Sequence, residues 1–133
     1  MREYLQANLD YENKLVRFLE YHDEPRAAAT FLPGMHEAAA IITFFFLGLR
    51  FLHQGQLKCR KKRVSPHLVH VFEEPADNQL EAFHDRLLGV LRQPTVRDGK
   101  WRLLECLPAW KGNWTNDCFS SFCLGILPES AYW

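Results

Sequence analysis

Residues 14–26 read KLVRFLEYHDEPR and predict the first strand of the fold and the polar turn that follows it. Its first half holds four closely spaced apolar residues: Leu15, Val16, Phe18 and Leu19. A compact apolar run of this length predicts a strand buried on at least one face. A dense polar cluster follows, and Pro25 within it ends regular structure. We therefore predict a strand over residues 14–19 whose carboxyl end leads into His22 and Asp23.

A second strand of the same kind follows after a helical segment. Residues 36–47 are almost entirely apolar, which predicts a helix that other elements must cover on most sides. Gly48 ends this segment, and residues 49–53 predict a short strand that runs into Gln54 and Gln56. Strand, helix and strand in this order form the unit of parallel sheets, in which binding and catalytic residues gather at the carboxyl ends of the strands.

The rest of the chain predicts a helix and then a change of structural class. Residues 75–91 carry apolar side chains at helical spacing, with Asp77 near the start. Residues 101–106 and 118–126 predict strands on either side of a stretch rich in turn residues. We therefore divide the chain into residues 1–95 and a β region over residues 96–133.

Composition excludes several functional classes. The 133 residues carry 16 basic and 16 acidic side chains, so neither a nucleic-acid partner nor an anionic membrane is expected. The most apolar stretch, residues 38–49, is shorter than the roughly 20 residues that cross a bilayer. No secretory signal is visible, so we expect a cytoplasmic protein whose four cysteines are reduced thiols. The cysteines lack metal-ligand spacing, and we expect neither a metal nor a cofactor.

Two blocks resemble the alpha-amylase family of glycoside hydrolases. Residues 15–26 resemble the family's seventh barrel strand, which ends in an Asn-His-Asp motif; here Tyr21 stands in place of the asparagine. Residues 48–56 are similar to the eighth strand and the loop that leaves it. The resemblance implies an α/β fold: a partial TIM barrel made of strand-helix units seven and eight, followed by a few strands of the C-terminal β region.

The same resemblance implies roles for the residues at the strand ends. Asp23 matches the third carboxylate of the family, which stabilises the transition state, and His22 matches its hydroxyl-binding neighbour. Gln54 and Gln56 at the other strand end are candidate substrate contacts. The family's nucleophile and general acid come from strands four and five, and no stretch here matches them. A retaining glycosidase needs both groups, so we expect this chain to be inactive on alpha-glucans by itself.

Several alternatives stay open on the sequence alone. His22 and Asp23 could form a capping or turn pair at a strand end, and Gln54 and Gln56 could be ordinary loop residues. Two strands of a barrel would leave unpaired edges and an uncovered apolar helix around residues 44–46. We therefore expect either self-association or complementation by a missing part of the barrel. The second functional hypothesis is a small self-associating interaction module without catalytic activity.

Overall fold

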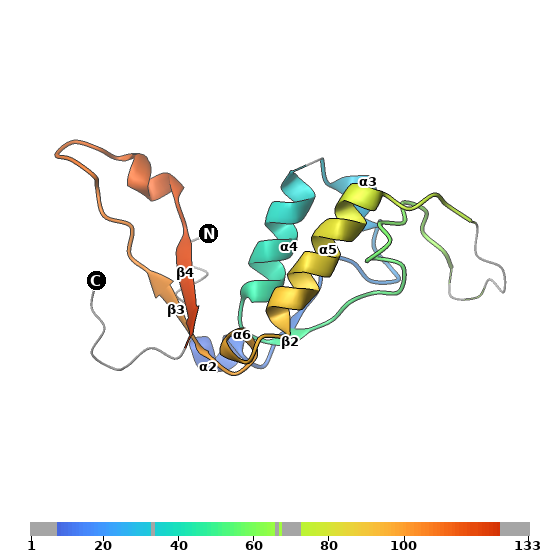
Figure 1. The fold of residues 1–133 in the computed structure, drawn as a ribbon, viewed down its shortest axis with the longest axis horizontal. Helices are drawn as coiled ribbons and strands as arrows, with labels where there is room; N and C mark the ends of the chain where they lie inside the picture. The colour runs from blue at the N-terminus through green and yellow to red at the C-terminus, as the bar shows by residue number, and fades with distance from the viewer. Residues whose placement is uncertain (1–7, 33, 66, 68–72, 126–133) are drawn as a thin grey trace.

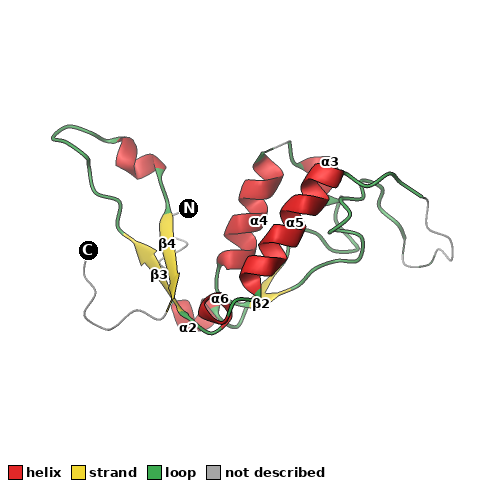
Figure 2. Ribbon diagram, viewed as in Figure 1, coloured by secondary structure: helices red, strands yellow, loops and turns green. Residues whose placement is uncertain are grey.

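The computed structural model describes residues 8–32, 34–65, 67 and 73–125. A group of helices with a small parallel sheet lies beside a separate β-hairpin (Figures 1 and 2). The elements in chain order are α2 (Leu9–Glu12), β1 (Val16–Arg17), α3 (Ala27–Thr30), α4 (Met35–Phe45), β2 (Leu49–Arg50), α5 (Asn78–Leu91), α6 (Pro94–Arg97), β3 (Lys100–Leu104), the 3-10 helix η1 (Thr115–Cys118) and β4 (Ser121–Gly125).

Strands β1 and β2 pair in parallel, which confirms the predicted strand-helix-strand unit. Val16 lies opposite Leu49, and the Leu49 amide donates to the carbonyl of Leu15 at 2.9 Å. Gly48 makes this close approach possible. Its φ is +115°, and a Cβ at this position would lie 2.4 Å from the Leu15 carbonyl oxygen. Any residue with a side chain would therefore push the two strands apart.

Helices α4 and α5 pack against each other and hold the main core. Asp77 accepts hydrogen bonds from the amides of Gln79 and Leu80 and so begins α5, as its position in the sequence predicts. The prediction that the apolar helix around residues 44–46 is uncovered is wrong. Phe44 is 1% exposed because α5 covers it, and Phe46 packs edge-on against Trp101 of β3 at 4.7 Å between ring centres.

The β3–β4 hairpin is antiparallel, and it pairs Trp101 with Leu124. Both predicted strands are present, although each is shorter than predicted; Ile126, the last residue of the second prediction, lies outside the described residues. Helix α6 spans Pro94–Arg97 and bridges the predicted boundary between residues 95 and 96, with Pro94 at its start, where a missing amide hydrogen is tolerated. Phe46, Trp101 and their neighbours form a second core cluster that joins the two regions.

Across the described part of the chain, none of the helices is both long and apolar enough to traverse a lipid bilayer.

Candidate functional site

His22 and Asp23 lie in the turn that follows β1, and both side chains face solvent. They are 58% and 61% exposed, and His22 Nε2 lies 3.1 Å from Asp23 Oδ2. Arg63 comes from the basic loop after β2, residues 58–63. Its Nε donates to the His22 carbonyl oxygen at 3.0 Å, and its Nη2 lies 3.8 Å from Asp23 Oδ1. Exposed ion pairs of this kind are weak and solvated. The Asp23 carboxylate is therefore accessible to a ligand.

Aromatic rings flank this turn. Phe18 lies edge-on to Tyr21 at 5.3 Å and to Phe51 at 6.5 Å, and Tyr21 lies edge-on to His22 at 5.5 Å. Phe18 and Phe51 remain exposed, so the carboxyl ends of both strands share an aromatic surface. This surface has a signal in the sequence, because Phe18 and Phe51 each come two residues after a paired position, Val16 and Leu49, of two adjacent parallel strands.

Tyr21 belongs to this aromatic surface. Its hydroxyl donates to Glu24 at 3.4 Å. Desolvation, followed by the negative charges of Glu24 and Asp23, raises the pKa of the Tyr21 phenol above its usual value. Tyr21 therefore stays protonated at neutral pH. Its ring packs between Phe18 and His22, so the residue that departs from the family motif has a packing role here.

A buried ionic cluster lies directly behind the exposed turn. Glu20 is 1% exposed; its Oε2 accepts from the amide of Ala27 at 2.6 Å, and its Oε1 lies 2.8 Å from Arg26 Nη2. The Oε1 contact lacks hydrogen-bond alignment, so the attraction to Arg26 is mainly electrostatic. Arg26 also donates to His53 Nδ1 at 2.8 Å and to the Gln54 carbonyl oxygen at 3.1 Å. The cluster thus joins the ends of the two strands.

This arrangement fixes the protonation of His53. Because the Arg26 guanidinium can only donate, His53 Nδ1 must accept, which assigns the neutral ring with its proton on Nε2. Glu20 Oε1 lies 3.6 Å from the same Nδ1, and with a neutral ring this is a contact and not an ion pair. The charge of Glu20 is therefore balanced by Arg26 alone within the described cluster.

Gln54 and Gln56 lie in different environments although they are two residues apart. Gln54 is exposed at the surface, while Gln56 is 1% exposed and its Oε1 accepts from the His53 amide at 3.2 Å. Gly55 between them has a φ of +83°, which turns the chain between the two positions. Gln54 is therefore available to a ligand at the strand end, and Gln56 holds the loop from the inside.

Among the described residues, two further carboxylates lie near this turn, Glu20 and Glu24. The sequence predicts a catalytic role for neither of them. Glu20 is closed to solvent and held by Arg26 and the Ala27 amide, so it cannot meet a substrate. Glu24 is exposed and bonds to the Tyr21 hydroxyl. Asp23, His22 and Gln54 are the predicted site residues that the fold leaves accessible at the strand ends.

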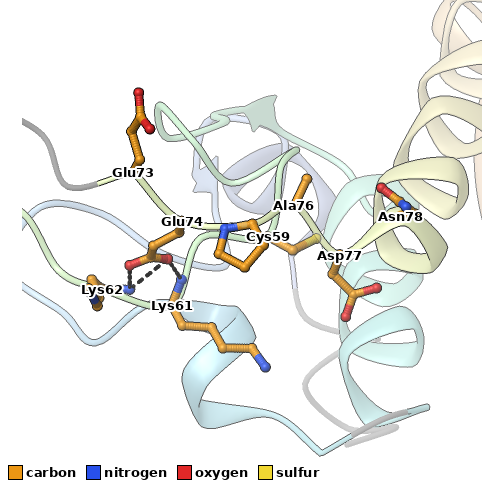
Figure 3. Close-up of a pocket in the computed structure, with 9 residues that line it drawn as sticks. Cys59, Lys61, Lys62, Glu73, Glu74, Ala76, Asp77 and Asn78 are labelled. Atoms are coloured by element: carbon orange, nitrogen blue, oxygen red, sulfur yellow. Dashed lines mark hydrogen bonds between the residues drawn. The ribbon is translucent and has the colours of Figure 1, made fainter.

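A polar pocket of about 560 Å³ lies elsewhere, between the basic loop and the start of α5. Figure 3 shows Glu74 turned toward Lys61 and Lys62, whose backbone amides donate to its carboxylate at 2.7 and 2.9 Å. Cys59 also lines the pocket, and burial raises the pKa of its thiol to about 11. A thiol that stays protonated is a poor nucleophile, so this pocket does not carry cysteine chemistry.

A pair of histidines is buried where α4 meets α5. His36 and His84 lie 5.4 Å apart between ring centres, and His84 Nδ1 lies 2.9 Å from the Leu80 carbonyl oxygen. Burial, and then the neighbouring His84, lower the pKa of His36. Sequence reasoning missed this pair, although His84 occupies a core position in the apolar stripe of α5. Within the ranges that the structure describes, no three histidine, cysteine or acidic side chains are arranged to hold a metal ion.

Comparisons with protein-family models, with curated proteins and with solved structures found no match to this chain.

Proposed function

We propose that this chain is part of an alpha-amylase-type glycoside hydrolase and that its exposed turn at His22 and Asp23 contacts an alpha-glucan. In this proposal β1 and β2 are strands seven and eight of a partial TIM barrel, and the β3–β4 hairpin begins the C-terminal β region. The observation that carries it is the exposure of Asp23 at the carboxyl end of a parallel strand, among exposed aromatic rings.

The chemistry of the turn suits a sugar ring. An anion at Asp23 would stabilise the positive charge that develops on a glycosyl group, and the imidazole of His22 can hold a hydroxyl. Phe18 and Phe51 offer apolar ring surface beside these polar groups. Gln54 adds an amide at the second strand end, and Gln56 supports the same loop from inside. The proposal assigns substrate contact to this chain and leaves the nucleophile and general acid to a partner part of the barrel.

The open sheet supports a need for such a partner. Val16 and Leu49 are neighbours on one face of the sheet, and Phe18 and Phe51 follow two residues later on the same side. All four side chains are exposed, and Leu49 reaches 67%. A parallel sheet is ordinarily covered on both faces, so further strands or another chain would cover this one. We include a cytoplasmic location in the proposal, where the free cysteines of the structure would remain reduced.

The direct test is calorimetric titration of the purified chain with maltoheptaose. We expect weak saturable binding that falls at least about tenfold in Asp23→Ala, because a charged hydrogen-bond acceptor contributes about 1.5 kcal/mol or more. Asp85→Ala is the matched control, since Asp85 is also an exposed aspartate but lies on α5. An equal loss in both variants, or no heat of binding to the parent chain, would exclude a glucan site at this turn.

The exposed sheet face also favours the second candidate, a self-associating interaction module. The test is light scattering on the chromatographic peak of the parent chain and of Leu49→Ser. A discrete oligomer that dissociates in Leu49→Ser and binds no maltoheptaose would favour the interaction module. A monomer that binds the sugar would favour the glycoside hydrolase proposal.

A further inference from the structure

A second pocket, of about 390 Å³, lies where the helical region meets the hairpin. Its lining residues come mainly from the segment between α4 and β2, from Arg50 in β2, from the end of α6 and the loop after it, and from β3 and β4. Figure 1 shows α6 between β2 and the base of the hairpin. Phe46 and Trp101 provide apolar wall, and Arg50, Arg97 and Lys100 provide positive charge. This pocket shares none of its lining residues with the His22–Asp23 turn.

The charges of this pocket do not balance. Asp98 forms an ion pair with Arg97, whose Nη2 donates to Asp98 Oδ2 at 2.7 Å. This hydrogen bond lowers the pKa of the Asp98 carboxyl. Arg50 and Lys100 remain, and in the described ranges no carboxylate lies within ion-pair distance of either. Among the described residues, the pocket therefore presents two cations without a protein counter-charge.

Arg50 is held in a fixed orientation in the pocket. Its Nε donates to the Phe44 carbonyl oxygen at 2.6 Å, which leaves the two outer nitrogens of the guanidinium for other partners. Burial lowers the pKa of Arg50. Since a guanidinium remains charged in proteins, Arg50 is a partly dehydrated cation that an anion would stabilise.

Trp101 supplies an independent sign of an unfilled polar contact. Its side chain is 7% exposed, and its indole Nε1–H is buried without a hydrogen-bond partner among the residues described. An indole nitrogen can only donate, and a buried donor without an acceptor is destabilising. The residues that line this cavity thus include two cations, Arg50 and Lys100, and a tryptophan whose buried indole N–H has no acceptor among the described residues.

We propose that this pocket binds a small oxyanion of the phosphate type, with its oxygens on Arg50 and Lys100 and any organic part against Phe46 and Trp101. The planar guanidinium matches two oxygens of a phosphate at once, and the ammonium of Lys100 adds a point charge. The aromatic wall distinguishes the two sources of this chemistry: a phosphate ester with an apolar group would bind more tightly than free phosphate.

The test is a magnetic-resonance titration of the full chain with inorganic phosphate and, separately, with phenyl phosphate, at constant ionic strength. The readout is the indole resonance of Trp101, assigned by its loss in Trp101→Phe. We expect a saturable shift, with tighter binding of phenyl phosphate. Lys100→Ala should weaken binding by about two- to fivefold, as for an exposed ion pair, and Arg50→Gln by about tenfold or more.

The matched control is Lys111→Ala, which removes an exposed lysine from the stretch between β3 and β4 and should leave binding unchanged. Equal weakening in Lys100→Ala and Lys111→Ala, or a shift that rises linearly without saturation, would overturn the proposal. If Arg50→Gln fails to fold by circular dichroism, the two lysine variants decide the matter. Asp23→Ala should bind both phosphates as the parent chain does, so this site and the glucan site fail or succeed independently.

Discussion

Glu20 and Asp23 are acidic residues three positions apart at the end of one strand, yet their surroundings are opposite. Glu20 is 1% exposed, with one oxygen hydrogen-bonded to the Ala27 amide and the other paired electrostatically with Arg26, whereas Asp23 is 61% exposed beside solvated partners. A buried charge must be paired in a fixed geometry, while an exposed charge keeps its water and can exchange it for a ligand. The strand end thus separates a carboxylate that holds the fold from one that is available for binding.

The largest effect is expected from Glu20→Ala. This change leaves the buried Arg26 guanidinium without its counter-charge and removes the acceptor for the Ala27 amide. Loss of one partner of a buried pair destabilises by about 3–5 kcal/mol. Urea unfolding followed by circular dichroism measures the free energy of unfolding. Glu24→Ala is the control and should lower it by less than about 0.5 kcal/mol. Similar losses in both variants would contradict the structural role of Glu20.

The next largest loss of stability is expected at Gly48, where the start of β2 approaches the backbone just before β1. Gly48→Ala brings a Cβ against the Leu15 carbonyl oxygen and forces a side chain onto a φ of +115°. We expect a loss of about 2–3 kcal/mol in the free energy of unfolding. Gly89→Ala is the control: it lies within α5 with nothing near its Cβ position, and should stabilise by about 0.5–1 kcal/mol. Equal behaviour of the two glycines would show that β1 and β2 do not require this close approach.

Much of the backbone could be predicted because the signals are local. The parallel β1–β2 pair, the helix that begins after Asp77 and the two hairpin strands all follow from periodicity and turn residues within short windows. The exposure of Asp23 at the strand end agrees with its proposed role. Whether the pair of strands belongs to a barrel stays a prediction, because the pairing of β1 with β2 is common to every parallel sheet.

The burial of polar groups could not be predicted, because it depends on contacts between distant segments. Glu20 and Glu24 look alike in the sequence, and only the approach of His53 and Gln54 to Arg26 encloses the first. Gln54 and Gln56 also look alike in the sequence, and the turn at Gly55 places the first at the surface and the second in the interior. The coverage of Phe46 depends in the same way on Trp101, which follows it by more than fifty residues.

His36 extends the comparison to a buried group that folding keeps neutral. Its folded pKa is lowered by burial and by His84, although Glu37 and Asp77 oppose the shift. The unfolded chain therefore takes up a proton first, so this contribution is complete above pH 6.5 and is lost as the pH falls below it. We expect the free energy of unfolding to fall there by at most about 1.4 kcal/mol per pH unit for this group. Urea unfolding across this range should show a smaller fall in the free energy of unfolding for His36→Leu than for the parent chain. A parent chain that loses no stability below pH 6.5 would contradict this role of His36.

The smallest effect on stability is expected from Asp23→Asn, and this makes it the sharpest test of the comparison. The substitution keeps the size of the side chain and removes a charge whose partners, His22 and Arg63, are themselves exposed. The free energy of unfolding should change by less than about 0.5 kcal/mol. If Asp23 serves binding, maltoheptaose affinity should fall in the same variant, because an amide lacks the charge that a carboxylate offers to sugar hydroxyls. A variant that loses stability but keeps its affinity would reverse the assignment, since Asp23 would then hold the turn as Glu20 holds the strand ends.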